Sequence, residues 1–244
     1  MSSVHLYTFC YNESYFIPFF LAHYAPWVSR IVVYDNQSSD DSVTLLQQSS
    51  KVEVRTWDTN NQIRDDLKVQ LMSNAWKESK GTADWVIVCD MDELLYHPQI
   101  TQLLPLLRQQ EYTVCRPLGY EMISEQRPDH GSPLLQQVRE GIRQPYWDKM
   151  VLFDPNEINE INFSPGGHYS LPEGRVRAFF RQEELKLLHY RYLGLDYILN
   201  KHLVRNTRLS EINRRNGWGQ QYTWTQERQE QVFRQLYARR KGVV

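Results

Sequence analysis

The sequence predicts an α/β fold in which a mostly parallel sheet is flanked by helices. In residues 1–118, short apolar or alternating segments recur between segments that carry apolar residues at helical spacing. This alternation is typical of right-handed βαβ units, whose strands form a parallel sheet. With 244 residues, 41% of them hydrophobic, the chain is long enough for one large domain. No linker is evident, so we expect a single domain over residues 1–244.

The individual elements follow from the pattern of each segment. Strands are expected at residues 4–9, 30–35, 51–57, 85–89 and 112–118. Helices are expected between them at residues 14–24, 38–48, 63–75 and 100–107. Asn12 and Ser14 are both suitable N-caps for the first helix. Together these elements give four successive strand–helix units and a fifth strand.

The second half of the chain, residues 119–244, is less regular. Clusters of glycine and proline predict loops and short strands from residue 119 to about Arg181. A further strand is expected at 184–192, and helices at 196–205 and 225–240. The formal charge also changes between the halves, from −5 over residues 1–118 to +4 over residues 119–244. We therefore expect the two halves to contact different partners.

The composition also indicates the compartment. Cys10, Cys89 and Cys115 lie in apolar segments, which predicts buried free thiols and a reducing environment. No apolar run reaches the 18 residues or so that span a bilayer. The first residues lack the basic and apolar regions of a signal peptide. These features predict a cytoplasmic protein.

Acidic residues follow the strand at 85–89 directly. Asp90 ends this strand, and in an extended chain Asp92 points the same way. Ligands of parallel sheets bind beyond the carboxyl ends of the strands, where two close carboxylates favour a hard cation such as Mg²⁺ or Mn²⁺. The alternative is that Asp92 caps a following helix, with Glu93 in its first turn.

Phosphate-binding glycine loops are missing. Gly81 is the only glycine in residues 1–118, and no dinucleotide-binding or P-loop motif occurs. A nucleotide diphosphate bound here would need a metal for much of its counter-charge. Asn12 and Glu13 after the first strand, and Asp35 after the second, would line the same crevice. For Asp35 the alternative is a loop residue in an Asx-turn.

Four blocks of the sequence resemble a known family. The segments YTFCYNESYFIPFFLAHY, VVYDNQSSDDS, DWVIVCDMDELL and HYRYLGLDYILNKH are similar to those of family 2-like glycosyltransferases with the GT-A fold. The similarity is strongest to bacterial members whose metal motif reads D-x-D-E. The blocks cover most of residues 1–95 and 184–205. The resemblance implies a Rossmann-like nucleotide-sugar-binding half, residues 1–118, and an acceptor-binding half, residues 119–244.

The resemblance also implies roles for matched residues. Asp90 and Asp92 would form the metal motif, with Asp90 closer to the ribose, and His189 would complete the site for Mn²⁺ or Mg²⁺. The alternative for His189 is a core histidine. The remaining contacts to the donor would come from Asp35 at the nucleobase, from Phe9, Tyr11 and Glu13 around the base, and from Lys201 at the diphosphate.

The catalytic base is not evident, because the acidic pair of many family 2 enzymes has no counterpart in the middle of the chain. Inverting transfer needs a base near the acceptor hydroxyl. Glu121, directly after the fifth strand, is the first candidate, and Asp148 is the second. The alternative for Asp148 is a salt bridge. Glu125 and His168 are further candidates, and His168 would alternatively bind acceptor or support its loop.

These features predict a metal-dependent, inverting glycosyltransferase. The donor would be a nucleotide-sugar, with a UDP-sugar favoured, and the acceptor a hydroxyl of a glycan or lipid-linked molecule. Two alternatives are a sugar-1-phosphate nucleotidyltransferase, which would need the missing glycine loop, and a non-catalytic nucleotide- or carbohydrate-binding module. We expect no nucleic-acid partner, because no recognition motif accompanies the basic tail.

The tail itself is strongly basic. Residues 201–244 contain ten Lys and Arg against three Glu, a balance of +7. As an amphipathic helix, residues 225–240 would bind an anionic membrane from the cytoplasmic side. Alternatively, the helix packs its apolar face on the main domain and exposes its charges to water.

Overall fold

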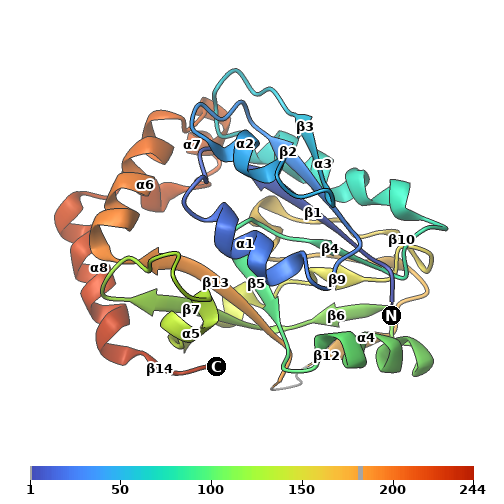
Figure 1. Cartoon of the computed structure of the whole chain (residues 1–244). Helices are drawn as coiled ribbons and strands as arrows, with labels where there is room; N and C mark the ends of the chain where they lie inside the picture. The colour runs from blue at the N-terminus through green and yellow to red at the C-terminus, as the bar shows by residue number, and fades with distance from the viewer. Residues whose placement is uncertain (1, 181–183) are drawn as a thin grey trace.

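The computed structural model describes residues 2–180 and 184–244, which form two sheets and a separate two-stranded ribbon (Figure 1). The larger sheet has seven strands and the smaller has five. Strands from both halves of the sequence enter both sheets. The predicted α/β class with a parallel-rich sheet and flanking helices is therefore confirmed.

The larger sheet has the strand order β12-β6-β9-β4-β1-β2-β3. Its strands are β1 (Val4–Cys10), β2 (Arg30–Asp35), β3 (Val52–Thr56), β4 (Trp85–Val88), β6 (Val114–Arg116), β9 (Leu152–Phe153) and β12 (Ala178–Phe180). The run from β4 to β3 is parallel, whereas β9 is antiparallel to both its neighbours. Strands buried on both faces read as continuous apolar runs, which is why β2 and β4 were recognisable.

Four helical segments connect these strands, as expected. They are α1 (Ile17–Tyr24), α2 (Ser42–Leu46), α3 (Asp65–Asn74) with its continuation η1 (Ala75–Ser79), and α4 (Ile100–Gln109). The expected N-cap of the first helix is wrong. Phe16 precedes α1 without a side-chain cap, and a proline lies in the first turn. Asn12 instead hydrogen-bonds the loop before α2, its Oδ1 accepting the Ser39 N–H at 2.7 Å.

The smaller sheet has the strand order β14-β8-β7-β13-β5. Its strands are β5 (Glu93–Tyr96), β7 (Leu118–Ser124), β8 (Glu140–Arg143), β13 (Lys186–Leu193) and β14 (Lys241–Gly242). The central strand β13 pairs antiparallel with β5 and parallel with β7. This register sets His189 beside Glu93 on one strand and beside Glu121 on the other.

The single strand expected at residues 112–118 is wrong. The segment forms two strands, β6 and β7, which belong to different sheets. Pro117 lies between them and has no N–H with which to continue a ladder. The chain therefore passes from the larger to the smaller sheet at this proline.

The extended conformation expected for Asp90 to Asp92, after β4, is also wrong. Residues 91–92 form a turn, in which the Glu93 N–H donates to the Asp90 carbonyl at 3.0 Å. The strand β5 begins immediately afterwards, so Asp92 caps no helix. We call residues 90–92 the acidic turn. Its two carboxylates reach different partners.

The remaining part of the second half consists of short elements, as expected. They are α5 (Leu134–Gln137), η2 (Pro145–Trp147), β10 (Ile158–Glu160), η3 (Pro165–Gly167) and β11 (Glu173–Gly174). The expected end of this irregular region, Arg181, lies outside the described residues. In this region η2 packs against β7, and Gly119 makes that possible, because a Cβ at residue 119 would overlap the backbone of Trp147.

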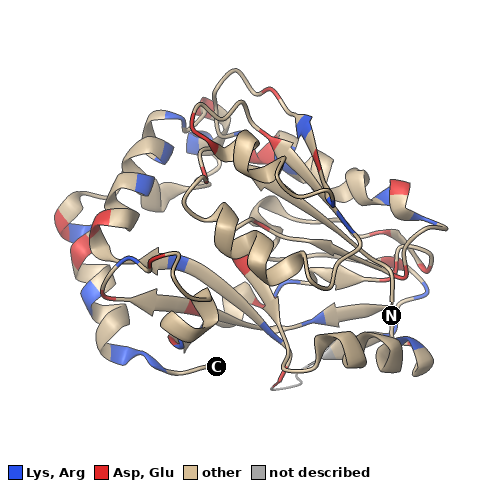
Figure 2. Ribbon diagram, viewed as in Figure 1, with Lys and Arg blue, Asp and Glu red and all other residues tan. Residues whose placement is uncertain are grey.

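The C-terminal region is helical, with α6 (Leu195–Thr207), α7 (Glu211–Arg215), η4 (Gln220–Thr223) and α8 (Gln226–Arg239). Thr225 caps α8, its hydroxyl accepting the Arg228 N–H. Phe233 is buried and clusters with Ile123, Tyr192 and Ile198 of the main domain. Figure 2 shows basic and acidic positions along the outside of α8. The apolar face of the tail helix therefore packs on the domain, as in the second of the two expectations.

Within residues 2–180 and 184–244, no helix combines the length and apolarity needed to cross a bilayer. Cys10, Cys89 and Cys115 are buried free thiols, as expected from their apolar surroundings.

Candidate active site

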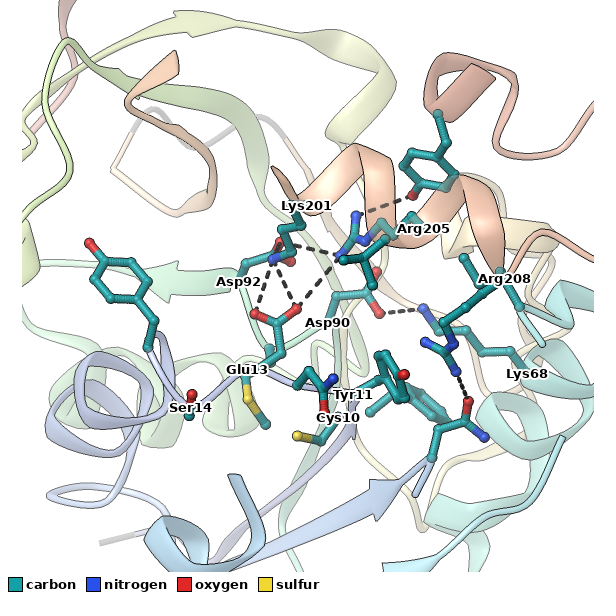
Figure 3. Close-up of a pocket in the computed structure, with 18 of the residues that line it drawn as sticks. Cys10, Tyr11, Glu13, Ser14, Lys68, Asp90, Asp92, Lys201, Arg205 and Arg208 are labelled. Carbon is teal, nitrogen blue, oxygen red and sulfur yellow. Dashed lines mark hydrogen bonds and ion pairs between the residues drawn. The ribbon is translucent and has the colours of Figure 1, made fainter. Parts of the chain in front are cut away.

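A cavity of about 400 Å³ opens at the carboxyl ends of β1 and β4. The segment after β1 forms one side, α3 contributes a second, and α6 lies across the opening (Figure 3). Its charged lining residues are Glu13, Arg64, Asp65, Lys68, Asp90, Asp92, Arg127, Lys201, Arg205 and Arg208. The acidic turn thus lies at the edge of the sheet where parallel folds bind ligands.

Each carboxylate of the acidic turn forms an ion pair with a lysine from a different helix. Lys68 of α3 places its Nζ 2.5 Å from Asp90 Oδ1. Lys201 of α6 lies 3.1 Å from Asp92 Oδ2 and 2.9 Å from Glu13 Oε1 (Figure 3). Arg205, one turn further along α6, is 3.7 Å from Glu13. The cations at Glu13 and Asp92 therefore come from the last third of the chain, whereas Asp90 is paired with Lys68 of the first half.

These ion pairs control the protonation of the acids. Burial opposes the ionisation of Asp90, but the ammonium groups of Lys68 and Lys149 outweigh it and lower its pKa to about 2. Burial opposes the ionisation of Asp92 as well, and Lys201 with His189 holds its pKa well below the usual range. For Glu13 burial prevails over Lys201, so its pKa is raised. Both aspartates are therefore carboxylates at neutral pH.

His189 lies between two carboxylates beneath the cavity. Its Nε2 is 3.6 Å from Asp92 Oδ1, and its Nδ1 is 3.1 Å from Glu121 Oε1, without the alignment of a hydrogen bond. The ring also packs on Trp147 at 4.4 Å. Burial alone would lower the pKa of His189, yet Glu121 and Asp92 raise it to about 10. His189 therefore belongs to the cluster around the acidic turn.

The donor types around Asp92 fit a divalent cation. Asp90 and Asp92 offer carboxylate oxygens, and His189 directs Nε2 toward Asp92 while Glu121 faces Nδ1. A carboxylate behind the second ring nitrogen is the usual support of a metal-binding histidine. As the side chains stand, no three Asp, Glu, His or Cys residues in the described part of the chain surround a common metal position. Binding a cation therefore requires Lys68 and Lys201 to leave the carboxylates and His189 to lose a proton.

Aromatic and polar groups line the end of the cavity away from Glu13. Phe9 and Trp57 meet edge to face at 5.6 Å, and the Arg208 guanidinium lies 3.1 Å from the centre of the Tyr11 ring. Arg208 also donates to Asn36 Oδ1 (Figure 3). Flat rings beside an amide and a guanidinium can hold a planar heterocycle by stacking and by hydrogen bonds.

Two expected donor contacts have other partners in the structure. Asp35 lies outside the cavity lining, and its carboxylate accepts from the N–H and the hydroxyl of Ser38 at 3.0 and 2.6 Å. This is the loop role named as the alternative. Asn12 borders the cavity with its backbone at φ 51°, while its side chain bonds the loop at Ser39. The neighbour of Asp35, Asn36, contributes to the cavity instead.

None of the four candidates for the base borders this cavity. Glu121 is buried, faces His189, and accepts from Trp147 Nε1 at 3.0 Å. Asp148 forms an ion pair with Arg143 at 2.6 Å, the salt bridge named as its alternative. His168 donates from Nδ1 to the Tyr146 carbonyl, and Glu125 accepts from a tyrosine of α8. The structure thus gives Glu121 and Asp148 partners that hold other residues in place.

Several residues that line the cavity were not predicted from the sequence. Lys68, Arg205, Arg208 and Trp57 lie on segments with no motif of their own, and only the fold brings them to the acidic turn. One signal was present: Arg205 follows Lys201 by four residues, so on a helix both cations share a face. Lys68 carried no such signal.

Solved structures of other proteins are similar to this chain in fold. S. aureus TarS is 13% identical, with a TM-score of 0.50 over 82% of this chain and 40% of that chain. TarS 1–349 in complex with UDP-GlcNAc is 10% identical, with a TM-score of 0.47 over 84% of this chain and 66% of that one. A search of the curated proteins found no match.

These similarities concern the fold alone. The chain spans well under half the length of TarS, and at this identity the similarity shows a common architecture only. The expected GT-A fold is confirmed at this level. A model described as glycosyltransferase family 92 matches residues 9–226. Because that match covers most of the sequence, the chain belongs to glycosyltransferase family 92.

Proposed function

We propose that this protein transfers a sugar from a nucleotide-sugar, with a UDP-sugar the favoured donor, to a hydroxyl group of a glycan or lipid-linked acceptor. The observation that carries the proposal is the cavity itself. Phe9, Tyr11 and Trp57 line it together with the acidic turn and three cations of α3 and α6. Such a lining is suited to a base, a diphosphate and a sugar bound in one groove.

The nucleobase of the donor would be bound by the aromatic residues of the cavity. Phe9, Tyr11 and Trp57 provide ring faces, and Asn36 provides an amide that can pair with a pyrimidine edge. Arg208 is held over Tyr11 and toward Asn36, so it is positioned before a ligand arrives. A base that enters here replaces the contact between Arg208 and Asn36 with contacts of its own.

Binding of the diphosphate falls to the cations. Lys68, Lys201 and Arg205 together carry three positive charges beside the acidic turn. We propose that Asp90, Asp92 and His189 hold Mn²⁺ or Mg²⁺, with Glu121 orienting the histidine ring. Such an ion would neutralise the diphosphate as negative charge develops on the leaving group. The two lysines, released from the aspartates, would then bind phosphate oxygens.

A single displacement with inversion is the expected course, and it requires a base at the acceptor hydroxyl. Glu121 remains the first proposed base and Asp148 the second, although each already has a partner in the structure. We also propose a cytoplasmic location, for which the three buried free thiols are the support.

The test is a release assay on the purified protein. Nucleoside diphosphate should be released from one or more of a panel of nucleotide-sugars, with Mn²⁺ or Mg²⁺ present, and excess EDTA should abolish the release. Asp92→Asn should lower turnover by about a hundredfold. Asp65→Asn is the matched control, because Asp65 lines the same cavity but accepts from Asn213. Full turnover in EDTA would overturn the metal assignment.

The two alternative functions give different results in the same assay. A nucleotidyltransferase would release pyrophosphate from a nucleoside triphosphate, and a binding module would bind UDP without turnover. The match to a glycosyltransferase family over residues 9–226 favours transfer over both.

A further inference from the structure

A run of aromatic rings leads from the surface of the protein to the acidic turn. Tyr146 and His168 are stacked with their centres 3.8 Å apart and their planes at 25°. Trp147 lies 4.6 Å from His168 and 4.4 Å from His189, which in turn is 3.6 Å from Asp92. We call Tyr146, Trp147 and His168 the aromatic platform. Only one ring, that of His189, separates it from Asp92.

The platform is not part of the proposed nucleotide site. None of its three residues lines the cavity that holds Phe9, Tyr11 and Trp57. It is reached through His189, on the smaller sheet, whereas the aromatic end of the cavity lies on the larger sheet. A ligand on the platform and a nucleotide in the cavity would therefore meet at the acidic turn from two sides.

The platform is exposed at Tyr146 and carries no charge. Tyr146 is 55% exposed, whereas Trp147 and His168 are half-buried. Burial and the nearby Lys149 lower the pKa of His168 to about 3, so its imidazole is neutral at physiological pH. Its Nδ1–H donates to the Tyr146 carbonyl, which fixes the tautomer and the orientation of the ring. The surface thus offers flat, neutral ring faces.

Several contacts beneath the platform hold it rigidly. Asp148 accepts from the Gly119 N–H at 2.8 Å and binds Arg143 at 2.6 Å, so it ties η2 to β7 and β8. Trp147 donates to Glu121 at 3.0 Å. Gly119 leaves no space between η2 and β7. Rigid aromatic residues that project a face to water are typical of small-molecule sites rather than of loops.

The geometry points to the aromatic platform as the acceptor subsite, with the C–H face of a neutral sugar ring stacked on the outward face of Tyr146, whose inner face is backed by His168. This inference rests on the proposed function, because it assigns the second substrate of that reaction. A pyranose ring has an apolar face and polar edges, so it complements an uncharged ring surface bordered by hydrogen-bonding groups. An anionic acceptor group would gain nothing from these rings, because the face of an aromatic ring is negative.

The inference can be tested without knowing the natural acceptor. The probes are methyl glycosides of glucose, galactose, mannose and N-acetylglucosamine, added to the full chain with UDP and Mn²⁺. Saturation-transfer NMR should detect binding of at least one of them, with the strongest transfer to C–H protons of one ring face. Tyr146→Ala should weaken this binding roughly tenfold, whereas Tyr146→Phe should retain it because the ring remains.

The controls separate this inference from the proposed function. Leu106→Ala removes an apolar side chain that is also 53% exposed, on α4, and should leave sugar binding unchanged. UDP affinity should be the same in all variants, because the platform lies outside the cavity. Unchanged sugar binding in Tyr146→Ala, or no binding of any probe to the native protein, overturns the acceptor subsite. Absence of UDP binding alone would overturn the nucleotide-sugar function instead.

Discussion

Lys201 is the residue on which the charge balance of the cavity depends. Its ammonium lies between Glu13 and Asp92, which are both buried. Two buried carboxylates without a cation repel each other and lose their solvation, so the lysine is a structural counter-ion before it is a ligand for phosphate. A divalent metal at Asp92 would take over the same task.

This dual role gives a prediction. Lys201→Met should lower the free energy of unfolding by about 3 kcal/mol, because one partner of a buried ion cluster is lost. Mn²⁺ should restore part of this stability and should raise the Tm of the variant more than that of the native protein. Thermal unfolding with and without Mn²⁺ measures both effects.

Lys80→Met provides the control, since Lys80 is exposed and its ammonium lies over the ring of Trp76, away from the acidic turn. It should show the same response to Mn²⁺ as the native protein. An equal response in Lys201→Met would mean that the cation does not bind where the ammonium was.

Glu121 is the second residue whose role can be decided. As a base it would act on the acceptor, whereas as a support for His189 it would act on the metal. The structure places it against His189 and Trp147, so we predict that Glu121→Gln weakens Mn²⁺ affinity about tenfold or more. Isothermal titration with Mn²⁺ in the presence of UDP measures this directly. A lower kcat with unchanged Mn²⁺ affinity would favour the role of base instead.

At the residue scale, the sequence pointed to those cavity residues that follow a local pattern or lie in a block that resembles a family. Asp90 and Asp92 were found because they follow an apolar strand within two residues, and Lys201 because its block resembles a family. Lys68 and Arg208 could not be found, because their closeness to the acidic turn arises from the packing of α3 and α6. For Asp35 the two readings look alike in sequence, because a carboxylate after a strand can face a ligand or, as here, bond its own loop at Ser38.

At the scale of elements, the acidic turn between β4 and β5 is held in shape by Glu93, the first residue of β5. Glu93 accepts the Asp90 N–H at 3.1 Å with one oxygen and pairs with Lys149 at 2.5 Å with the other. Both side chains are almost fully buried. The last letter of the D-x-D-E motif therefore holds the turn and does not face the cavity.

We predict that Lys149→Met destabilises the protein by about 3–5 kcal/mol, because it leaves the Glu93 carboxylate buried without its cation. Adding Glu93→Gln should recover much of this loss, since an amide can still accept from Asp90 while carrying no charge. Urea unfolding of the native protein, both single variants and the double variant gives the coupling energy. Additive effects would show that the two side chains act independently.

The errors in the predicted elements have physical causes. Pro117 divides one apolar segment between two sheets; the proline marks the break in the strand, but nothing local shows that the two parts join different sheets. The strand β5 follows β4 after only a turn, and the acidic residues between them gave no sign of a second strand, so β5 was not expected. Short strands such as β9 and β12 are defined by their partners in the sheet rather than by their own sequence.

At the scale of the molecule, acidic residues from the first half of the chain and basic residues from the second half form ion pairs inside the cavity. The basic residues of α6 neutralise acids of the first half, while those of α8 lie outside on the surface. Because Phe233 and its neighbours use the apolar face of α8 for packing, any attraction to a membrane must rest on charge alone.

This gives a prediction for the tail. Full-length protein should co-sediment weakly with anionic vesicles at low salt, should lose this binding at high salt, and should not bind neutral vesicles. Arg234→Glu with Arg239→Glu should abolish the binding, whereas Lys80→Glu with Arg177→Glu, a charge reversal elsewhere on the surface, should preserve most of it. Equal recovery with both kinds of vesicle would rule out peripheral attachment through α8.

The position of β13 and α6 late in the chain affects how the protein can fold as it is made. When residues 1–118 have left the ribosome, β4 still lacks its neighbour β9, and Glu13 and Asp92 still lack Lys201. A nascent chain at this stage has an open sheet edge and uncompensated buried acids, both of which favour aggregation or proteolysis. We expect stable folding only after α6 has emerged, so a chain interrupted before residue 201 would be degraded rather than persist as a nucleotide-binding fragment.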